Sequence, residues 1–234
     1  MGGTGIATDM REAASALRWW LEAGVDGAIQ EAPRNWLAAS SPQQPVALEP
    51  DTPAAPPAPA TLEEFREWLA GHEGPLASAR SRPVHPEGAE GAEVMLLAEP
   101  PTRDELGSGS PIGGESAELM TRMLTAIGLE DKAYSANLAC FHSPSARLSA
   151  SELERCAAAA LTHVALAKPK RLLLLGDAPC RAVLGKPLLE ARGHVHKVEG
   201  VRTVATFHPR QLLKRPSDKA LAWKDLLLLV EEPA

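Results

Sequence analysis

The sequence predicts a three-layer α/β/α sandwich built on a central, mostly parallel sheet. Short apolar runs of strand length, such as Val94–Ala98 and residues 172–175, alternate along the chain with amphipathic helical stretches. These runs are apolar at every position, which is typical of strands that helices cover on both faces. With 234 residues, 44% of them hydrophobic, the chain is long enough to bury a sizeable core.

The elements follow a regular order after residue 60. Thr61 and Glu64 match a capping box, and Leu62, Phe65 and Trp68 form the apolar face of the helix that begins there. Beyond it, the pattern predicts strands at 94–98, 134–138 and 172–175, helices at 115–127, 149–167, 178–184 and 217–231, and a two-stranded passage around residues 199 and 200. In a parallel sheet the loops after the strands meet at one edge, where ligands usually bind.

The first 60 residues differ in composition from the rest. Residues 10–23 predict a short amphipathic helix, and residues 40–60 hold seven prolines among Ala, Gln and Ser. A segment of this composition cannot bury a core and is typical of an extended linker. We therefore expect an N-terminal helical element over residues 1–39, a Pro/Ala-rich linker over 40–60 and the main domain over 61–234.

The composition indicates a cytoplasmic protein with one basic region. The chain has no run of eighteen apolar residues and no basic start followed by an apolar stretch, so we expect neither a membrane span nor a secretory signal. Three scattered cysteines do not make a disulfide framework, which fits a reducing compartment. Residues 168–225 carry thirteen Lys and Arg against five Asp and Glu, a formal charge of +8. Since the whole chain has a net charge of −6, the rest of the chain carries −14. This asymmetry fits a phosphate-binding face, and it fits solvated helix ends equally well.

The most informative segment is residues 206–216, which follows the last predicted strand. His208 leaves that strand directly before a proline, and we expect the proline to hold the imidazole outward at the sheet edge. Arg210, Lys214 and Arg215 follow shortly after it. A histidine beside basic residues suits chemistry on an anionic ligand; the alternative is a histidine that merely closes a loop.

Four segments, in this order, resemble the uracil-DNA glycosylases of the bacterial and archaeal branch that carries an iron–sulfur cluster. They are the loop from Ala98 to residue 114, Asn137 with Pro144 and Arg147 beyond it, the segment 169–176, and the stretch 205–216 around His208. The resemblance covers about residues 62–230. It implies a base excision repair enzyme that rotates a damaged nucleotide out of DNA and hydrolyses its N-glycosyl bond.

The resemblance also implies a role for each matching residue. His208 is the donor that stabilises the departing base, Asn137 reads the edge of the base, and Glu99 orients or activates water. Ile112 stands where the family has the phenylalanine on which the base stacks. The side chains expected to bind DNA are those of Arg147, Arg210, Lys214 and Arg215.

Departures from the family pattern affect the first loop and its stacking residue. Ala98 replaces a glycine, and Pro100 and Thr102 stand where the family's loop has small residues and glycine, so the backbone of this loop has less freedom. An aliphatic Ile112 stacks on a base more weakly than an aromatic ring does, and such stacking is worth roughly 1–3 kcal/mol.

The cysteines depart from the family pattern as well. Only Cys140 and Cys156 lie near the family's ligand positions, and the segment 71–76, which corresponds to the front cysteine pair, contains none. A cubane cluster takes four thiolates, so we expect no complete cluster, no other cofactor and no metal. The more ordinary interpretation of Cys156 and Cys180 is that they are small buried helix residues.

Other functions stay open at this point. A catalytically degenerate member of the family would act as a DNA-binding or accessory module. Residues 107–110 form a Gly-Ser loop that matches neither a dinucleotide fingerprint nor a P-loop, so a flexible loop is favoured over a phosphate cradle. His194 and His196 share a strand face but lack a third metal ligand. The expected partner is DNA with a flipped base; we expect no membrane contact, and a monomer is favoured.

Overall fold

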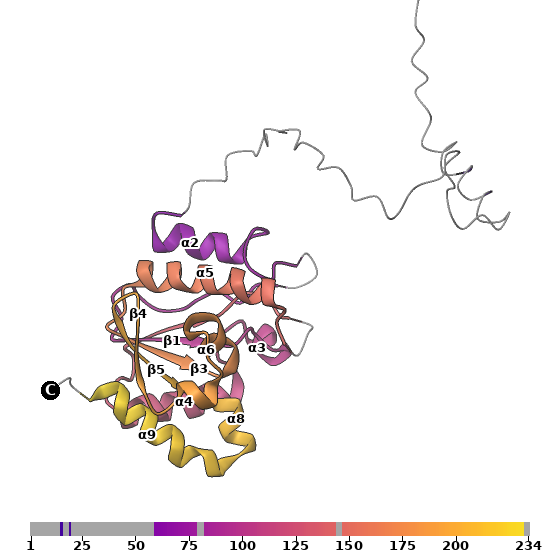
Figure 1. Cartoon of the computed structure of the whole chain (residues 1–234). Coiled ribbons are helices and arrows are strands. Elements are labelled where there is room, and N and C mark those ends of the chain that lie inside the picture. The colour runs from indigo at the N-terminus through magenta and orange to yellow at the C-terminus, as the bar shows by residue number, and fades with distance from the viewer. Residues whose placement is uncertain (1–14, 16–18, 20–58, 79–81, 144–146, 232–234) are drawn as a thin grey trace, which may run out of the picture. The chain divides into compact units, whose positions relative to one another are not determined.

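One five-stranded sheet with helices on both faces forms the centre of the domain (Figure 1). The computed structural model describes residues 59–78, 82–143 and 147–231, together with the isolated positions 15 and 19. Its strands are β1 (Val94–Ala98), β2 (Ala133–Asn137), β3 (Arg171–Leu175), β4 (Val195–Val198) and β5 (Val201–Thr206), in the order β2-β1-β3-β5-β4. The first four in that order are parallel, and β4 is antiparallel to β5. The predicted three-layer α/β/α fold is confirmed.

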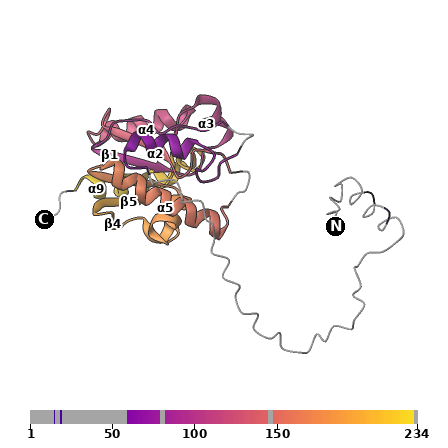
Figure 2. The same ribbon diagram turned by 90° about the horizontal axis from the view of Figure 1, so that it is seen from above.

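Helices form the two outer layers. In chain order they are α2 (Leu62–Ala70), α3 (Arg103–Ser108), α4 (Gly114–Ala126), α5 (Ala150–Ala167), α6 (Asp177–Leu184), α7 (Leu188–Ala191), α8 (Pro209–Lys214) and α9 (Lys219–Val230), with a 3₁₀ turn at Pro216–Asp218. Helices α5 and α6 lie on one face of the sheet and α4 and α9 on the other, while α2 packs on the outside of α5 (Figures 1 and 2).

The alternation of side chains along β1 explains its continuous apolar run. Met95 and Leu97 pack into the cluster that contains the inner face of α5, whereas Leu96 and Ala98 pack into the cluster beneath α4 and α9. Every residue of this strand is buried because neighbouring side chains point to opposite, equally covered faces.

Two short helices replace segments that the sequence pattern predicted to be loops. The prediction of a flexible loop over residues 107–110 is wrong for the first two of them, because α3 runs to Ser108. Gly109 ends the helix in the left-handed region at φ 75°. A capping box between Thr102 and Glu105 begins this helix. The basic stretch after His208 is likewise the helix α8, with Pro209 in its first turn.

Apart from positions 15 and 19, the N-terminal helical element over 1–39 lies outside the described residues, as does nearly all of the linker over 40–60, so both stay predictions. In the described ranges, no helix has the length and apolar character needed to cross a bilayer.

Candidate active site

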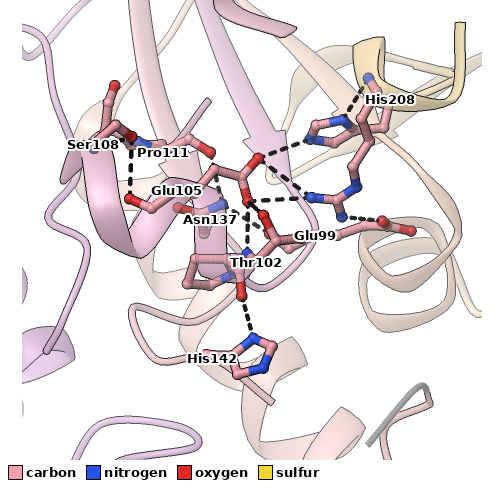
Figure 3. A network of polar contacts seen from close by, with 11 residues as sticks. Glu99, Thr102, Glu105, Ser108, Pro111, Asn137, His142 and His208 are labelled. Carbon is pink, nitrogen blue, oxygen red and sulfur yellow. Dashed lines mark hydrogen bonds and ion pairs between the residues drawn. The ribbon is translucent and has the colours of Figure 1, made fainter. Parts of the chain in front are cut away.

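The parallel strands end at the same edge of the sheet and bring distant residues together there. In the strand registers Ala98 pairs with both Asn137 and Leu175, and Leu175 pairs with Thr206. The side chains at or just beyond these positions therefore meet. Figure 3 shows Glu99, Asn137 and His208 in one network of polar contacts at this edge.

The carboxamide of Asn137 is fixed by the backbone. Its Nδ2 donates to the carbonyl oxygen of Glu99 at 2.8 Å and to that of Pro111 at 3.0 Å. Both partners are acceptors only, so the amide nitrogen must face them and the amide is held in one orientation. The other end of the group, Oδ1, is buried and has no hydrogen-bond partner.

The imidazole of His208 is also fixed at one nitrogen and unpartnered at the other. Its Nδ1 accepts a hydrogen bond from the backbone N–H of Arg210 at 3.2 Å, which caps the start of α8. In a neutral ring the proton then sits on Nε2, which is buried without a partner. Burial, together with the positive charge of Arg210, holds the pKa of His208 well below its usual value, so the ring is neutral at pH 7.

The prediction that the proline would hold this ring outward is wrong. His208 is only 1% exposed, because its Nδ1 is used to cap α8 and Glu105 lies across from its Nε2. Pro209 begins a helix here rather than an open loop.

Glu99 follows β1 and is held on both carboxylate oxygens. Its Oε1 accepts from the backbone N–H of Asp177 at 3.1 Å, and its Oε2 accepts from Nη2 of Arg210 at 2.5 Å. The carboxylate lies against Gly176, whose φ is +101° and where an added Cβ would come within 2.6 Å of the Glu99 carboxyl carbon. Only glycine fits at position 176 with Glu99 in this place.

Arg210 joins Glu99 to a second carboxylate that the sequence analysis missed. Glu105 on α3 is 3% exposed, and its Oε2 accepts from the backbone N–H of Thr102 at 2.7 Å and from the Thr102 hydroxyl at 3.0 Å. Nη1 of Arg210 lies 3.3 Å and 3.2 Å from its two oxygens. Glu105 Oε1 also lies 4.0 Å from Nε2 of His208. Arg210, expected to hold a DNA phosphate, is thus paired with two carboxylates in the free chain.

Two hollows flank this network. The first has a volume of about 520 Å³ and is lined by the loops after β1 and β2 and by the start of α6, with Arg147, His142 and Arg181 among its residues. The second, of about 400 Å³, is lined by Glu99, His208, Arg210, Gln211, Lys214 and Arg215. Glu99 and Arg210 line both hollows, so their ion pair forms a shared wall. The exposed side chains of Arg147, Lys214 and Arg215 place positive charge at the two openings.

Ile112 lies apart from these two hollows. It is 6% exposed and packs in the core cluster with Met120 and Leu124 of α4. It lines a third hollow of about 330 Å³ that contains neither Asn137 nor His208. Its neighbour Pro111 does contact Asn137, so the segment, although not the Ile112 side chain, belongs to the network.

The cysteines do not fit an iron–sulfur cluster. The chain has three, all buried as free thiols, and burial raises the pKa of Cys140 and Cys180 to about 12 and that of Cys156 to about 11. Cys140 packs beside Phe65 and Leu69. Cys156 lies on α5 and belongs to the larger cluster, which also contains Met95 and Leu97 of β1.

The backbone also leaves no room for a further thiolate at position 74. In the segment 71–76, an added Cβ on Gly74 would lie 2.3 Å from the backbone oxygen of Leu69. Among the described residues there is also no group of three or more His, Cys, Asp or Glu side chains arranged to hold a metal ion.

A local signal for Glu105 is present in the sequence. Thr102 and Glu105 have the Thr-x-x-Glu spacing of a capping box, the same pattern that identifies the start of α2. Nothing in the sequence indicates that Arg210, more than one hundred residues later, pairs with this carboxylate. His142, whose Nδ1 lies 2.7 Å from the carbonyl oxygen of Pro101, likewise has no recognisable pattern around it.

The chain is similar to known proteins over the range in which these residues lie. The sequence profile of the uracil DNA glycosylase superfamily matches residues 85–227, a range that contains every candidate site residue. The type-4 uracil-DNA glycosylase of Archaeoglobus fulgidus is 28% identical over 163 residues, which span 64% of this chain and 82% of that protein. The type-4 uracil-DNA glycosylase of Pyrobaculum aerophilum is 25% identical over 166 residues, which span 66% of this chain and 85% of that protein. This chain therefore belongs to the uracil DNA glycosylase superfamily.

Proposed function

We propose that this chain hydrolyses the N-glycosyl bond of uracil, or of a related damaged base, in DNA. Membership of the superfamily and similarity to two type-4 uracil-DNA glycosylases support this activity. The observation that carries the proposal is a pair of unpartnered buried atoms at the site. In the described part of the chain, three buried side-chain polar atoms have no hydrogen-bond partner, and two of them are Asn137 Oδ1 and His208 Nε2.

These two atoms have complementary polarity. Asn137 Oδ1 is an acceptor, and Nε2–H of the neutral His208 is a donor. Leaving either atom buried without a partner costs roughly 1–3 kcal/mol, so a ligand that satisfies both is favoured. A base with an N–H next to a carbonyl group has the matching donor and acceptor, and uracil carries this unit at N3 and C2. Cytosine has a lone pair at N3, which would face the lone pairs of Oδ1.

The orientation of the Asn137 amide supports discrimination against cytosine. To donate to cytosine N3 the amide would have to flip, which would set Oδ1 against the carbonyl oxygens of Glu99 and Pro111. Both N–H groups of Nδ2 are used by these carbonyls, so Asn137 offers the base an acceptor only. In this proposal the base is selected by its ring N–H, and its group at C4 is not read by Asn137.

In the proposed reaction the C1′–N1 bond breaks and its electron pair moves onto the base, largely to O2. Nε2–H of His208 donates to that oxygen and lowers the barrier, since a fixed donor is worth most where charge develops. Water adds to the cationic C1′, and the Glu99 carboxylate takes the proton that water loses. The departing base anion finally takes up that proton through solvent, which restores the Glu99 carboxylate and leaves a free base and an abasic site.

The basic side chains around the hollows suit the DNA backbone. We propose that Arg147, Lys214 and Arg215, all exposed at the openings, bind phosphates on either side of the flipped nucleotide. Ile112 remains a candidate for contact with the base, but only if the segment moves, because its side chain now packs in the core.

The cysteines and the composition of the site also bear on the cofactor, the compartment and the oligomeric state. We propose that the chain works without an iron–sulfur cluster, because its three buried thiols do not fit one. Free cysteines also favour action in the reducing cytoplasm. No residue of the site requires a second copy of the chain, which favours a monomer.

The test is release of uracil from labelled single- and double-stranded oligonucleotides, each with a single uracil. Strand cleavage after alkali should appear with uracil and be absent with cytosine at the same position. If neither strand type yields abasic sites, hydrolysis is wrong for this chain.

A second function is favoured by the burial of His208 and by the packing of Ile112 in the core, since neither side chain is exposed for contact with a base. The alternative is a catalytically silent member that binds DNA as an accessory module. Salt-dependent binding to oligonucleotides without base release would support it.

A further inference from the structure

We propose that Arg210 is a latch on the base pocket, closed by Glu99 and Glu105 in the free chain and opened when a DNA phosphate takes its guanidinium. This inference rests on the proposed function. It explains how a histidine that is almost completely buried can meet a nucleobase.

Burial increases inward across the network. His208, Glu105 and Asn137 are 1%, 3% and 4% exposed, whereas the side chains of Arg210 and Glu99 are 25% and 27% exposed. The outermost pair is therefore the one that forms the shared wall of the two hollows. In Figure 3 the carboxylate of Glu105 faces the imidazole of His208. Arg210 forms ion pairs with both Glu105 and Glu99. The Arg210 guanidinium lies on the exposed side of these groups, so its release would widen the way from the hollow to Nε2.

The chemistry of the latch suits an exchange of anions. A guanidinium binds two oxygens of a phosphate with the same fork that it presents to a carboxylate. Arg147, Lys214 and Arg215 concentrate positive charge beside Arg210 and bring a phosphate backbone near it. Glu105 keeps its bonds to Thr102 when Arg210 leaves, so α3 remains capped.

Opening would also change the state of Glu99. In the closed form one of its oxygens is bound to Arg210, and only the other accepts from the Asp177 N–H. Once Arg210 has left, the freed oxygen can accept a proton from water. Arg210 is in this respect a positioning residue, which couples contact with DNA both to entry of the base and to release of the residue that activates water.

The first experiment measures access to His208 by hydroxyl-radical labelling, read residue by residue by mass spectrometry. Replacing Arg210→Ala keeps the backbone N–H that caps α8 and removes the latch. Reaction of His208 should rise by about tenfold or more, as expected for losing charge-assisted hydrogen bonds. His163, which is 2% exposed and lies in a separate network with Tyr134, is the internal standard.

The controls separate opening from loosening of the fold. Arg215→Ala removes an exposed charge from the same hollow and should leave the reaction of His208 unchanged. Arg210→Lys keeps the charge without the fork and should fall between the parent and Arg210→Ala. Equal reactivity of His208 in the parent and Arg210→Ala, or a parallel rise at His163, would overturn the latch.

The second experiment tests the trigger. The side-chain Nε–H resonance of Arg210 is followed by ¹⁵N nuclear magnetic resonance while a single-stranded oligonucleotide without uracil is added. The resonance should shift at saturation, whereas that of Arg192, which pairs with buried Asp225, should not. An unshifted Arg210 resonance, or an oligonucleotide that does not bind, contradicts phosphate as the trigger. Neither experiment needs turnover, so failure of uracil release would refute the proposed function and leave the latch to be judged separately.

Discussion

Two buried histidines, His163 on α5 and His208 just after β5, differ in whether Nε2 has a hydrogen-bond partner. His163 on α5 accepts a hydrogen bond at Nε2 from the hydroxyl of Tyr134, with 2.6 Å between the atoms, and the nitrogen Nε of Arg66 donates to that hydroxyl at 3.0 Å. The Phe65 ring packs against the imidazole, with 5.1 Å between ring centroids. His208 is buried as deeply, yet its Nε2 has no partner.

This difference separates a structural residue from a candidate for catalysis. The network around His163 ties α2, α5 and β2 together, and every group named in it has a partner. A buried donor without a partner, such as Nε2 of His208, lowers the stability of the free chain. A ligand that accepts a hydrogen bond from this donor would recover the lost free energy. Burial alone therefore does not distinguish the two histidines, but hydrogen-bond satisfaction does.

The largest effect is expected for His208→Asn. Asparagine preserves an acceptor that can cap α8, while the Nε2–H donor is lost. We expect the single-turnover rate of uracil release to fall by about 100- to 1,000-fold, as for loss of one oxyanion donor, with little change in thermal stability. The matched control is His194→Ala on the exposed part of the chain before β4, which should leave the rate unchanged. A variant that releases uracil at the parental rate would remove His208 from the mechanism.

The second prediction concerns the unpartnered acceptor, Asn137 Oδ1. An oligonucleotide carrying 3-deazauracil, which has a C–H in place of the ring N–H, should be processed about tenfold more slowly or worse, because Oδ1 stays unsatisfied. An oligonucleotide carrying 4-thiouracil keeps that N–H and should react within about threefold of uracil, as its altered group is not read by Asn137. Single-turnover rates for the three bases check this. Equal sensitivity to both changes would mean that Asn137 reads both positions.

The fold and the strand-end residues were predictable because both depend on local patterns. Apolar runs identify β1 and β3, capping residues identify the starts of α2 and α5, and a parallel sheet then brings Glu99, Asn137 and His208 to one edge. The state of these residues was not predictable. The burial of His208 depends on α8 and on Glu105, and the pairing of Arg210 with two carboxylates joins segments far apart in the chain. Such contacts leave no periodicity in the sequence.

The third prediction addresses His163, whose Nε2 is bonded to the Tyr134 hydroxyl. Burial lowers the pKa of His163 to about 3, so the folded chain resists its protonation while the unfolded chain takes up a proton near pH 6.5. The contribution to stability is therefore constant above pH 6.5 and is lost as the pH falls from there toward 3. His163→Gln keeps an acceptor for Tyr134 but does not titrate. Between pH 7 and 5 the parent should lose about 2 kcal/mol more unfolding free energy than this variant, as measured by urea denaturation. Parallel pH profiles for the two proteins would contradict a neutral, buried His163.

The smallest effects are expected for the cysteines, which we expect to be structural residues like His163. Cys140 and Cys156 are buried thiols with raised pKa values, so they behave as small apolar residues rather than as thiolate ligands. Cys140→Ala and Cys156→Ala should each cost about 1 kcal/mol of unfolding free energy, the range for a small cavity, and leave uracil release unchanged. Iron and sulfide analysis of the purified parent and of both variants provides the decisive measurement. If the parent contains stoichiometric iron that either substitution removes together with activity, these thiols belong with His208 among the functional residues, and the hydrogen-bond criterion has missed them because a thiol makes only weak hydrogen bonds.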